Sequence, residues 1–293
     1  MTTVIAVTGG KGGTGKTLLA INLAYILSRN DKTLLVDADV DNPCSKTFLK
    51  TSPNFRKIVK EFRPRINQDK CKLCGTCVQN CHEHALLLIP GKRVTLMPEL
   101  CEGCGVCKIV CPFGAIEDSW IDSGYIEEYQ VKENLDAIVG ELKPTTKRTP
   151  VMILKTLKHA EERMNNYRYV VVDSPPGTGS GIYAVMRFSE KILAVTEPTR
   201  LGLTDLMKLY RLYKQVKPER KLLVVVNKSG IRGELREELE EMLSNLKVEW
   251  RKIPYDESAV KSYVEGSILV ERFPDSPSAQ AITRIAKEVL EGS

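Results

Sequence analysis

The chain has 293 residues, 42% hydrophobic and 27% charged, enough for one large α/β domain and a small added module. Its 43 basic and 37 acidic residues leave a net charge of +6, and no basic stripe is concentrated enough to indicate nucleic-acid binding. The sequence has neither a signal-peptide pattern nor an apolar run of membrane-spanning length, so we expect a cytoplasmic protein that does not bind membranes.

A glycine-rich loop follows the first predicted strand. Residues 9–17 read GGKGGTGKT and lie between an apolar run at 3–8 and an apolar helix expected at 18–27. Strand, loop and helix N-terminus are together the context of a phosphate-binding loop, whose backbone N–H groups bind phosphate oxygens. Lys16 should contact the β- and γ-phosphates, and the Thr17 hydroxyl should bind Mg²⁺. The predicted ATP-binding residues of the loop are Gly10, Lys11, Gly12, Gly13, Thr14, Gly15, Lys16 and Thr17.

Carboxylates end two further predicted strands. The strand at 32–39 carries Asp37 and Asp39, which are two residues apart and therefore point to the same side of an extended segment. The strand at 167–173 ends in Asp173, which we expect to bind Mg²⁺ through water. Parallel sheets bind ligands at the carboxyl ends of their strands, so these positions suit a nucleotide site. For Asp39, an ordinary polar strand end is the alternative.

Eight of the nine cysteines form an internal repeat. Each half has the spacing C-x₂-C-x₂-C-x₃-C, typical of bacterial ferredoxins, in which the fourth cysteine ligates the other cluster. Zinc is the alternative for paired CxxC motifs, but the three-residue step to the fourth cysteine disfavours it. The spacing assigns one [4Fe–4S] cluster to Cys71, Cys74, Cys77 and Cys111, and a second to Cys101, Cys104, Cys107 and Cys81.

The repeat is expected to form a small α+β ferredoxin-like insert. Two short strands, at 85–89 and 93–97, should pair as a hairpin within it. His82 stands where the ferredoxin pattern has proline, and we interpret it and His84 as solvated loop residues rather than extra ligands. Cys44, outside the repeat, is interpreted as a small buried hydrophobe. The predicted domains are residues 1–60 and 121–293 for the large domain and 61–120 for the insert, with a connector over 50–65.

The remaining elements complete an α/β fold with a mostly parallel sheet and helices on both faces. The C-terminal helix carries apolar residues at helical spacing and should pack on the core rather than bind a membrane. The strands are predicted at 134–142, 191–195, 222–227 and 247–252, and the helices at 150–164, 202–216 and 279–290.

A second lysine inside the loop, Lys11, makes it similar to the deviant loop KGGxxGK[ST] of the MinD/ParA/Mrp and nitrogenase iron protein group of ATPases. The run DSPPGTG that begins at Asp173 resembles the DxPPG element of the same group. The resemblance implies a P-loop NTPase fold and a dimer that encloses two ATP molecules. In that dimer, Lys11 would contact the nucleotide of the partner subunit.

The same resemblance assigns roles to further residues. Asp37 matches an acid near Mg²⁺, and Asp39 matches the acid that orients the attacking water. Asn227 matches the residue whose amide reads the adenine edge, and Pro254 and Tyr255 match the loop beside the adenine. The catalytic residues are therefore predicted to be Lys11, Lys16 and Asp39.

The whole chain is similar to an ATPase of this group that contains an inserted ferredoxin domain, with ATP, Mg²⁺ and two [4Fe–4S] clusters as ligands. We expect slow, partner-stimulated ATP hydrolysis by a homodimer, or by a pair with a homologue, and a redox or apo-protein partner at the insert. Three functions compete: ATP-gated electron transfer, Mrp-like assembly of iron–sulfur or other metallocofactors, and MinD-like partner positioning with structural clusters. No cysteine follows Cys111, so the cysteines by which the nitrogenase iron protein and Mrp hold a cluster across the dimer are absent. This disfavours both a bridging cluster and a transient Mrp-like scaffold, whereas the complete eight-cysteine set favours stable redox centres.

Overall fold

The computed structural model describes residues 2–144, 149–216, 219–233 and 235–291. It divides into two compact units. The first comprises Met1–Arg56, Ile126–Glu141 and Thr149–Ser293, and the second comprises Lys57–Tyr125 and Leu142–Arg148. The second unit is thus an insertion in the chain of the first, and the expected insert, residues 61–120, lies within its main segment.

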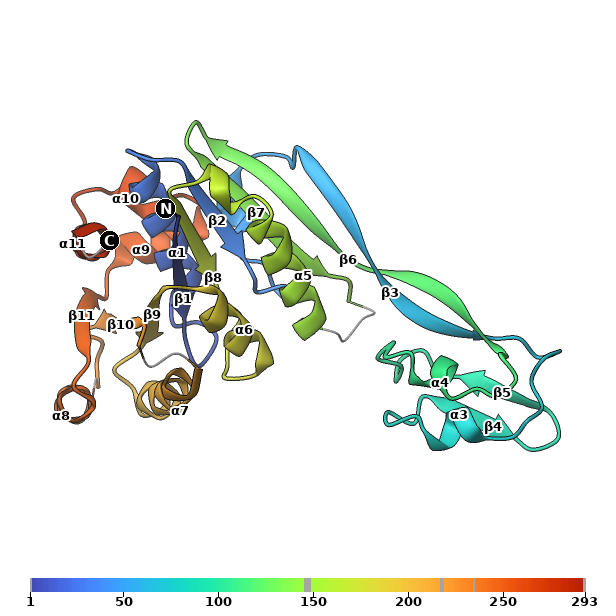
Figure 1. Cartoon of the computed structure of the whole chain (residues 1–293). Helices are drawn as coiled ribbons and strands as arrows, with labels where there is room; N and C mark the ends of the chain where they lie inside the picture. The colour runs from blue at the N-terminus through green and yellow to red at the C-terminus, as the bar shows by residue number, and fades with distance from the viewer. Residues whose placement is uncertain (1, 145–148, 217–218, 234, 292–293) are drawn as a thin grey trace. The chain divides into compact units, whose positions relative to one another are not determined.

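A mostly parallel sheet forms the centre of the first unit (Figure 1). The strand order is β11-β10-β9-β1-β8-β2-β7-β6-β3, and the pairs from β11 through β7 are all parallel. Every residue of β1 and of β8 is buried, as expected for strands covered on both faces. The parallel strands are β1 (Thr3–Thr8), β2 (Thr33–Asp37), β7 (Leu135–Leu142), β8 (Tyr169–Asp173), β9 (Lys191–Thr196), β10 (Lys221–Ser229) and β11 (Glu249–Pro254).

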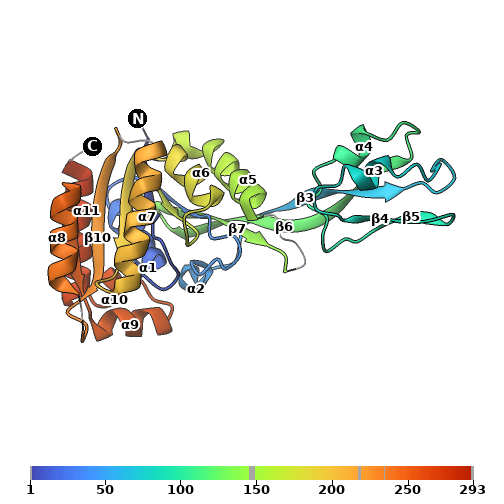
Figure 2. The same ribbon diagram turned by 90° about the horizontal axis from the view of Figure 1, so that it is seen from below.

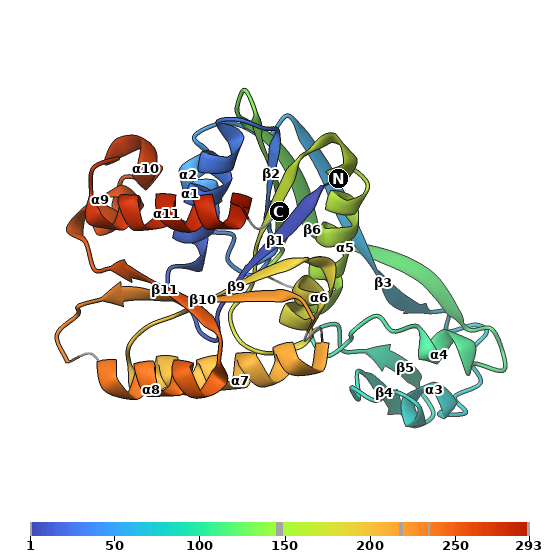
Figure 3. The same cartoon turned by 60° about the vertical axis from the view of Figure 1, so that its left-hand side comes forward.

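Helices cover both faces of this sheet (Figure 3), which confirms the predicted fold class. On one face lie α1 (Lys16–Ser28), α9 (Glu257–Val264), α10 (Leu269–Arg272) and α11 (Pro277–Glu291). On the other lie α5 (Thr149–Glu161), α6 (Ser180–Phe188), α7 (Arg200–Val216) and α8 (Arg236–Leu246). The short helix α2 (Lys46–Leu49) follows β2, and the 3₁₀ turn η1 (Met164–Asn166) follows α5.

The C-terminal helix packs on the core, as predicted. Ile282, Ile285 and Ala286 of α11 are at most 1% exposed and belong to the same apolar cluster as α1. Within the described residues, none of the helices combines the length and the hydropathy that crossing a bilayer requires.

The expected connector over residues 50–65 is wrong, because most of it is a strand. Strand β3 (Phe55–Ile66) lies next to β6 (Ile116–Lys132) in the sheet order, and β6 was likewise not predicted. In β3 the buried positions are Val59, Glu61, Arg63 and Pro64. Two of these four buried residues are charged and a third is proline, so the alternation of apolar and polar residues that marks a strand is hidden.

The second unit contains the predicted hairpin, and in it β4 (Leu86–Ile89) pairs antiparallel with β5 (Arg93–Leu96). The short helices α3 (Thr76–Gln79) and α4 (Val106–Ile109) both lie on one side of this hairpin (Figure 2), and a small core lies between them and the strands. Each begins after a glycine with positive φ, 77° at Gly75 and 80° at Gly105. The core consists of Cys77, Leu86, Val94, Cys107 and Ile116, so two cysteines form part of the packing.

Asp256 joins two helices of the first unit. Its Oδ1 accepts a hydrogen bond from the backbone N–H of Ser258 at 2.8 Å, which caps α9. Its Oδ2 accepts from the backbone N–H of Ser278 at 3.1 Å and from the Ser278 hydroxyl at 2.8 Å, at the start of α11. We expect Asp256→Ala to lower the free energy of unfolding by about 1–2 kcal/mol, because the donors at the starts of both α9 and α11 lose their acceptor.

Urea denaturation measures this change. The matched control is Asp275→Ala at an exposed position, which we expect to change the free energy of unfolding by less than about 0.5 kcal/mol. Equal midpoints for the two variants would contradict the capping role of Asp256.

Candidate functional site

A cavity of about 780 Å³ opens in the first unit where its parallel strands end. The glycine loop after β1 lines it, together with segments that follow the other strands. Open parallel sheets bind ligands at this edge. Among the predicted site residues, those that line the cavity are Gly12, Gly13, Gly15, Lys16, Thr17, Asp39, Asn227, Pro254 and Tyr255.

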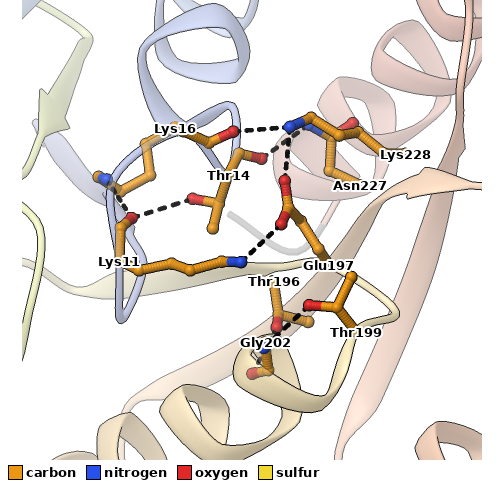
Figure 4. A network of polar contacts seen from close by, with 10 residues as sticks. Lys11, Thr14, Lys16, Thr196, Glu197, Thr199, Gly202, Asn227 and Lys228 are labelled. Carbon is orange, nitrogen blue, oxygen red and sulfur yellow. Dashed lines mark hydrogen bonds and ion pairs between the residues drawn. The ribbon is translucent and has the colours of Figure 1, made fainter. Parts of the chain in front are cut away.

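Hydrogen bonds within the chain hold the glycine loop in shape (Figure 4). The Lys16 ammonium donates to the Lys11 carbonyl at 3.0 Å, and the Asn227 amide donates to the Thr14 carbonyl at 2.7 Å. Gly15 has φ 93°, and a Cβ added there would lie 2.2 Å from the Asn227 amide nitrogen. Only glycine therefore fits this position beside Asn227.

Glu197 is a site residue that was not predicted. It lies just after β9, and its carboxylate binds the Lys11 ammonium at 2.8 Å and the Lys228 ammonium at 2.5 Å (Figure 4). Lys228 also donates to the Gly13 carbonyl at 2.8 Å. Burial alone would raise the pKa of Glu197, but the two lysines outweigh it and lower that pKa below its ordinary value. The position of Glu197 at a strand end, the criterion that selected Asp173, could have identified it.

The acids form a buried cluster beside the loop. Asp37 and Asp173 are direct partners in the register of β2 and β8, so two carboxylates of like charge end neighbouring strands. Burial raises the pKa of Asp37 to about 6. Burial, followed by the Asp37 charge, raises the pKa of Asp39 to about 7. Burial and then Asp37 raise the pKa of Asp173 well above its ordinary value.

The hydrogen bonding of these acids differs. The Asp37 carboxylate accepts from the Asp39 N–H at 2.9 Å and from the N–H and hydroxyl of Ser45 at 3.1 and 2.5 Å. Both oxygens of Asp173 are buried and accept no hydrogen bond of normal geometry, although the Thr17 hydroxyl is near enough to lower the pKa of that carboxyl. Such an orphaned pair of oxygens, next to a hydroxyl and other acids, fits the outer ligand sphere of a hydrated divalent cation.

Cys44 is not the buried hydrophobe that we expected. Its thiol is half-buried, lines the main cavity and shares a hydrogen bond with the Tyr263 hydroxyl. The neighbouring Ser45, which was also not predicted, is fully buried against Asp37. Neither residue lies at a strand end, so the sequence carried no comparable signal for them.

In the second unit, the repeat cysteines line two cavities. One cavity, of about 310 Å³, is lined by Cys81, Cys101, Cys104 and Cys107. The other, of about 10 Å³, is lined by Cys71, Cys74, Cys77 and Cys111. These are the same two groups of four that the spacing assigns to separate clusters. In the described parts of the chain, however, no three His, Cys, Asp or Glu side chains converge closely enough to hold a single metal ion.

Backbone N–H groups point at the sulfurs of both groups. Those of Ala85, Gly103 and Ala115 donate to the thiols of Cys81, Cys101 and Cys111, each at 3.3 Å. Burial is the main cause that raises the pKa of Cys77, and the neighbouring thiols of Cys111 and Cys71 raise it further. Burial also raises the pKa of Cys107 to about 11. His82 and His84 are exposed, and the His82 ring bonds Glu83 at 2.8 Å, in agreement with solvated histidines.

The acid cluster predicts an unusual dependence of stability on pH. Its carboxyls titrate higher in the folded than in the unfolded chain, so between about pH 4 and 7 the folded state binds more protons and stability falls as pH rises. We expect Asp173→Asn, which removes a buried charge and its repulsion of Asp37, to stabilise the metal-free protein at pH 8 by about 1–3 kcal/mol. At pH 4 or below, the variant and the wild type should be nearly equal in stability.

Urea denaturation in the presence of a chelator, at pH 4, 6 and 8, measures the effect. Asp275→Asn at an exposed position is the control and should follow the wild type at each pH. A variant less stable than the wild type at pH 8 would show that the charge on Asp173 is compensated in the folded chain.

The whole chain can be compared with known protein families and structures. The family model of the CobQ/CobB/MinD/ParA nucleotide-binding domain matches residues 5–270. An uncharacterized protein of Methanocaldococcus jannaschii is 30% identical over 278 residues, which cover 90% of each chain. The cell division ATPase MinD of Pyrococcus furiosus has a similar fold, with a TM-score of 0.62, 20% identity and complete coverage of both chains. MinD of Pyrococcus horikoshii, solved with Mg-ADP, has a TM-score of 0.61 and 21% identity, and the match covers 99% of this chain and 96% of that one. The chain therefore belongs to the CobQ/CobB/MinD/ParA family of nucleotide-binding domains.

Proposed function

We propose that this protein is an ATP-hydrolysing, nucleotide-switched dimer that couples ATP to electron transfer through two [4Fe–4S] clusters. One observation carries the proposal: a glycine loop beside buried acids, of which Asp173 has no hydrogen-bond donor on either oxygen, occurs in the same chain as two cavities, each lined by four cysteines. The first feature is suited to a magnesium nucleotide, and the second is suited to a pair of cubane clusters.

The nucleotide site supplies the groups that phosphoryl transfer to water needs. Mg²⁺, held by Thr17 and through water by Asp173, with Asp37 close by, would neutralise charge that develops on the phosphates. Lys16 exchanges its bond to the Lys11 carbonyl for a bond to the phosphates. Asp39 orients the attacking water, and its pKa of about 7 suits a group that accepts a proton near neutral pH.

Adenine recognition is proposed for the rim of the same cavity. Pro254 and Tyr255 line it, and Tyr255 leaves 51% of its surface exposed for a base to cover. Asn227 uses its amide nitrogen to hold the Thr14 carbonyl, so its oxygen is the atom that we assign to the base.

Lys11 is the residue through which we propose that ATP promotes dimerisation. Within one chain, the ion pair with Glu197 occupies the Lys11 ammonium and holds it inside its own subunit. We propose that Lys11 leaves Glu197 to contact the partner's ATP, while Lys228 remains to balance the Glu197 carboxylate. The cost of separating a half-buried pair would keep Lys11 withdrawn until the partner's phosphates are present.

The cysteine cavities fit the clusters by their chemistry. When bound, a [4Fe–4S] cluster carries single electrons at a potential set by hydrogen bonds to sulfur and by burial. A four-iron cluster is much larger than one ion, so its ligand thiols stand around a cavity and not around a point. The cavity of about 310 Å³ has room for such a group, whereas the thiols around the cavity of about 10 Å³ would have to move apart to bind one. The buried thiols of Cys77 and Cys107 have raised pKa values, so they would bind as thiolates only when coordination removes their protons.

Two alternatives retain specific support. Assembly of iron–sulfur or other metallocofactors is favoured by Cys74 and Cys104, because these thiols are exposed, one in each group, and a transferable cluster needs accessible ligands. Partner positioning with structural clusters is favoured by the fold similarity to MinD. ATP-dependent transfer of iron to an apo-protein would favour assembly over electron transfer, and redox-inert clusters would favour positioning.

Iron content tests the cluster assignment. We expect about eight irons per chain in anaerobically purified wild type, and about four in Cys104→Ser, because one group of four loses a ligand and the other keeps all of its own. Iron analysis and electron paramagnetic resonance are the measurements. Cys44→Ser is the matched control and should keep about eight irons. About four irons or fewer in the wild type would rule out two clusters.

The ATPase roles predict two different defects. Lys11→Ala should still bind ATP but lose ATP-dependent dimerisation, whereas Asp39→Ala should dimerise with ATP and hydrolyse it about 10²–10⁴-fold more slowly. Light scattering and phosphate release measure the two effects. The exposed Lys287→Ala should behave as the wild type in both assays. Normal ATP-dependent dimerisation of Lys11→Ala would contradict the proposed contact with the partner's nucleotide.

A further inference from the structure

A short segment after β2 contacts the acid cluster with one residue and β6 with the next. Ser45 donates two hydrogen bonds to the buried Asp37 carboxylate. The adjacent Lys46, at the start of α2, extends its ammonium to the Glu127 carboxylate at 2.6 Å and also pairs with Glu141. Because Ser45 and Lys46 are consecutive, a displacement of one displaces the other.

Glu127 is the centre of a buried network on β6. Its side chain is 1% exposed and accepts hydrogen bonds from the Arg56 side chain at 2.6 Å and the Tyr129 hydroxyl at 2.6 Å, besides its pair with Lys46. Burial would raise the pKa of Glu127, but these donors outweigh it and lower that pKa. A buried carboxylate that is charged and bonded on all sides cannot lose one partner without a large cost.

The network lies where the chain passes between its two units. Arg56 of β3 is the last residue of the first unit before the insertion, and the first unit resumes at Ile126, one residue before Glu127. Everything between these points is the cysteine-bearing unit. Both strands that lead to it are therefore held, at their first-unit ends, by the same carboxylate.

We infer that the Lys46–Glu127 pair transmits the state of the nucleotide site to β3 and β6, and through them to the cysteine-bearing unit. The inference rests on the proposed function, whose coupling it assigns to named residues. A cation near Asp37 competes with Ser45 for the same carboxylate, so occupancy of the site changes the bonds that hold Ser45. A displacement of Ser45 also displaces Lys46, and the half-buried ion pair with Glu127 resists separation, so Glu127 and Arg56 move with Lys46.

The experiment compares Lys46→Met with Lys132→Met. Both changes remove an ion pair between a lysine and a glutamate that involves β6. Lys132, however, pairs with Glu271 at 2.7 Å in an exposed position, and among the contacts that the structure describes it has none with the acid cluster. Amide hydrogen exchange in residues 57–66 and 116–125 is measured with and without ATP on the loaded protein, alongside the midpoint potential of its clusters. In the wild type, we expect ATP to change exchange in these strands by about 5–150-fold.

Lys46→Met should lose most of this ATP effect, while its affinity for ATP stays within about threefold of the wild type. Lys132→Met and the charge-conserving Lys46→Arg should keep the effect. If Lys46→Met does not fold, Glu127→Gln is the deciding variant, because its side chain keeps its shape and can still contact Arg56 and Tyr129. It should also lose the ATP effect.

The outcomes separate the inference from the proposed function. If the wild type shows no change in exchange or potential with ATP, the proposed coupling fails and the inference falls with it. If the wild type responds and Lys46→Met and Glu127→Gln respond equally, the inference is overturned, whereas the proposed function stands.

Discussion

The central constraint in this protein is the burial of like charges at one edge of its sheet. The register of β2 and β8 sets Asp37 directly beside Asp173, and neighbouring strands lie only about 5 Å apart. Hydrogen bonds from Ser45 and Asp39 satisfy Asp37, but none satisfies Asp173. A site built in this way costs stability when empty of cations, so ligand binding explains its acids better than folding does.

The lysines in the loop and beside it are arranged in the opposite way, because each has a partner within the chain. Lys11 pairs with Glu197, Lys16 donates to the Lys11 carbonyl, and Lys228 bridges Glu197 to Gly13. These lysines are thus held by backbone carbonyls and one carboxylate, and Lys16 offsets only part of the burial that raises the pKa values of Asp39 and Asp173. Entry of a phosphate-bearing ligand would exchange these internal bonds for bonds to its oxygens, and this exchange provides the physical basis for two conformations.

The insertion leaves the core of the first unit uninterrupted. The parallel core of the first unit is complete in residues that come before and after the insertion, so the cysteine-bearing unit needs no share of it. That unit has a small core of its own, in which Cys77 and Cys107 pack with three aliphatic residues. Its thiols are therefore structural neighbours of the hairpin as well as candidate ligands, which relates its stability to whatever the cysteines bind.

Local sequence patterns were sufficient for the parts of this protein that are local in structure. The glycine loop, the strand-terminal Asp37 and Asp173 and the β4–β5 hairpin each depend on residues within one or two elements, where spacing determines geometry. The division of eight cysteines into two groups also agrees with the prediction from the ferredoxin spacing, in which the fourth cysteine of each run joins the other three.

Only the tertiary structure decided which distant residues meet. Strands β3 and β6 were missed because charged residues such as Glu61 and Arg63 occupy the buried face, a pattern that local rules assign to a connector. The partners of Lys11 and Lys46, Glu197 and Glu127, lie far along the chain and become neighbours only through the order of the strands. Ion pairs of this kind have no sequence periodicity, so no pattern in the chain could have predicted them.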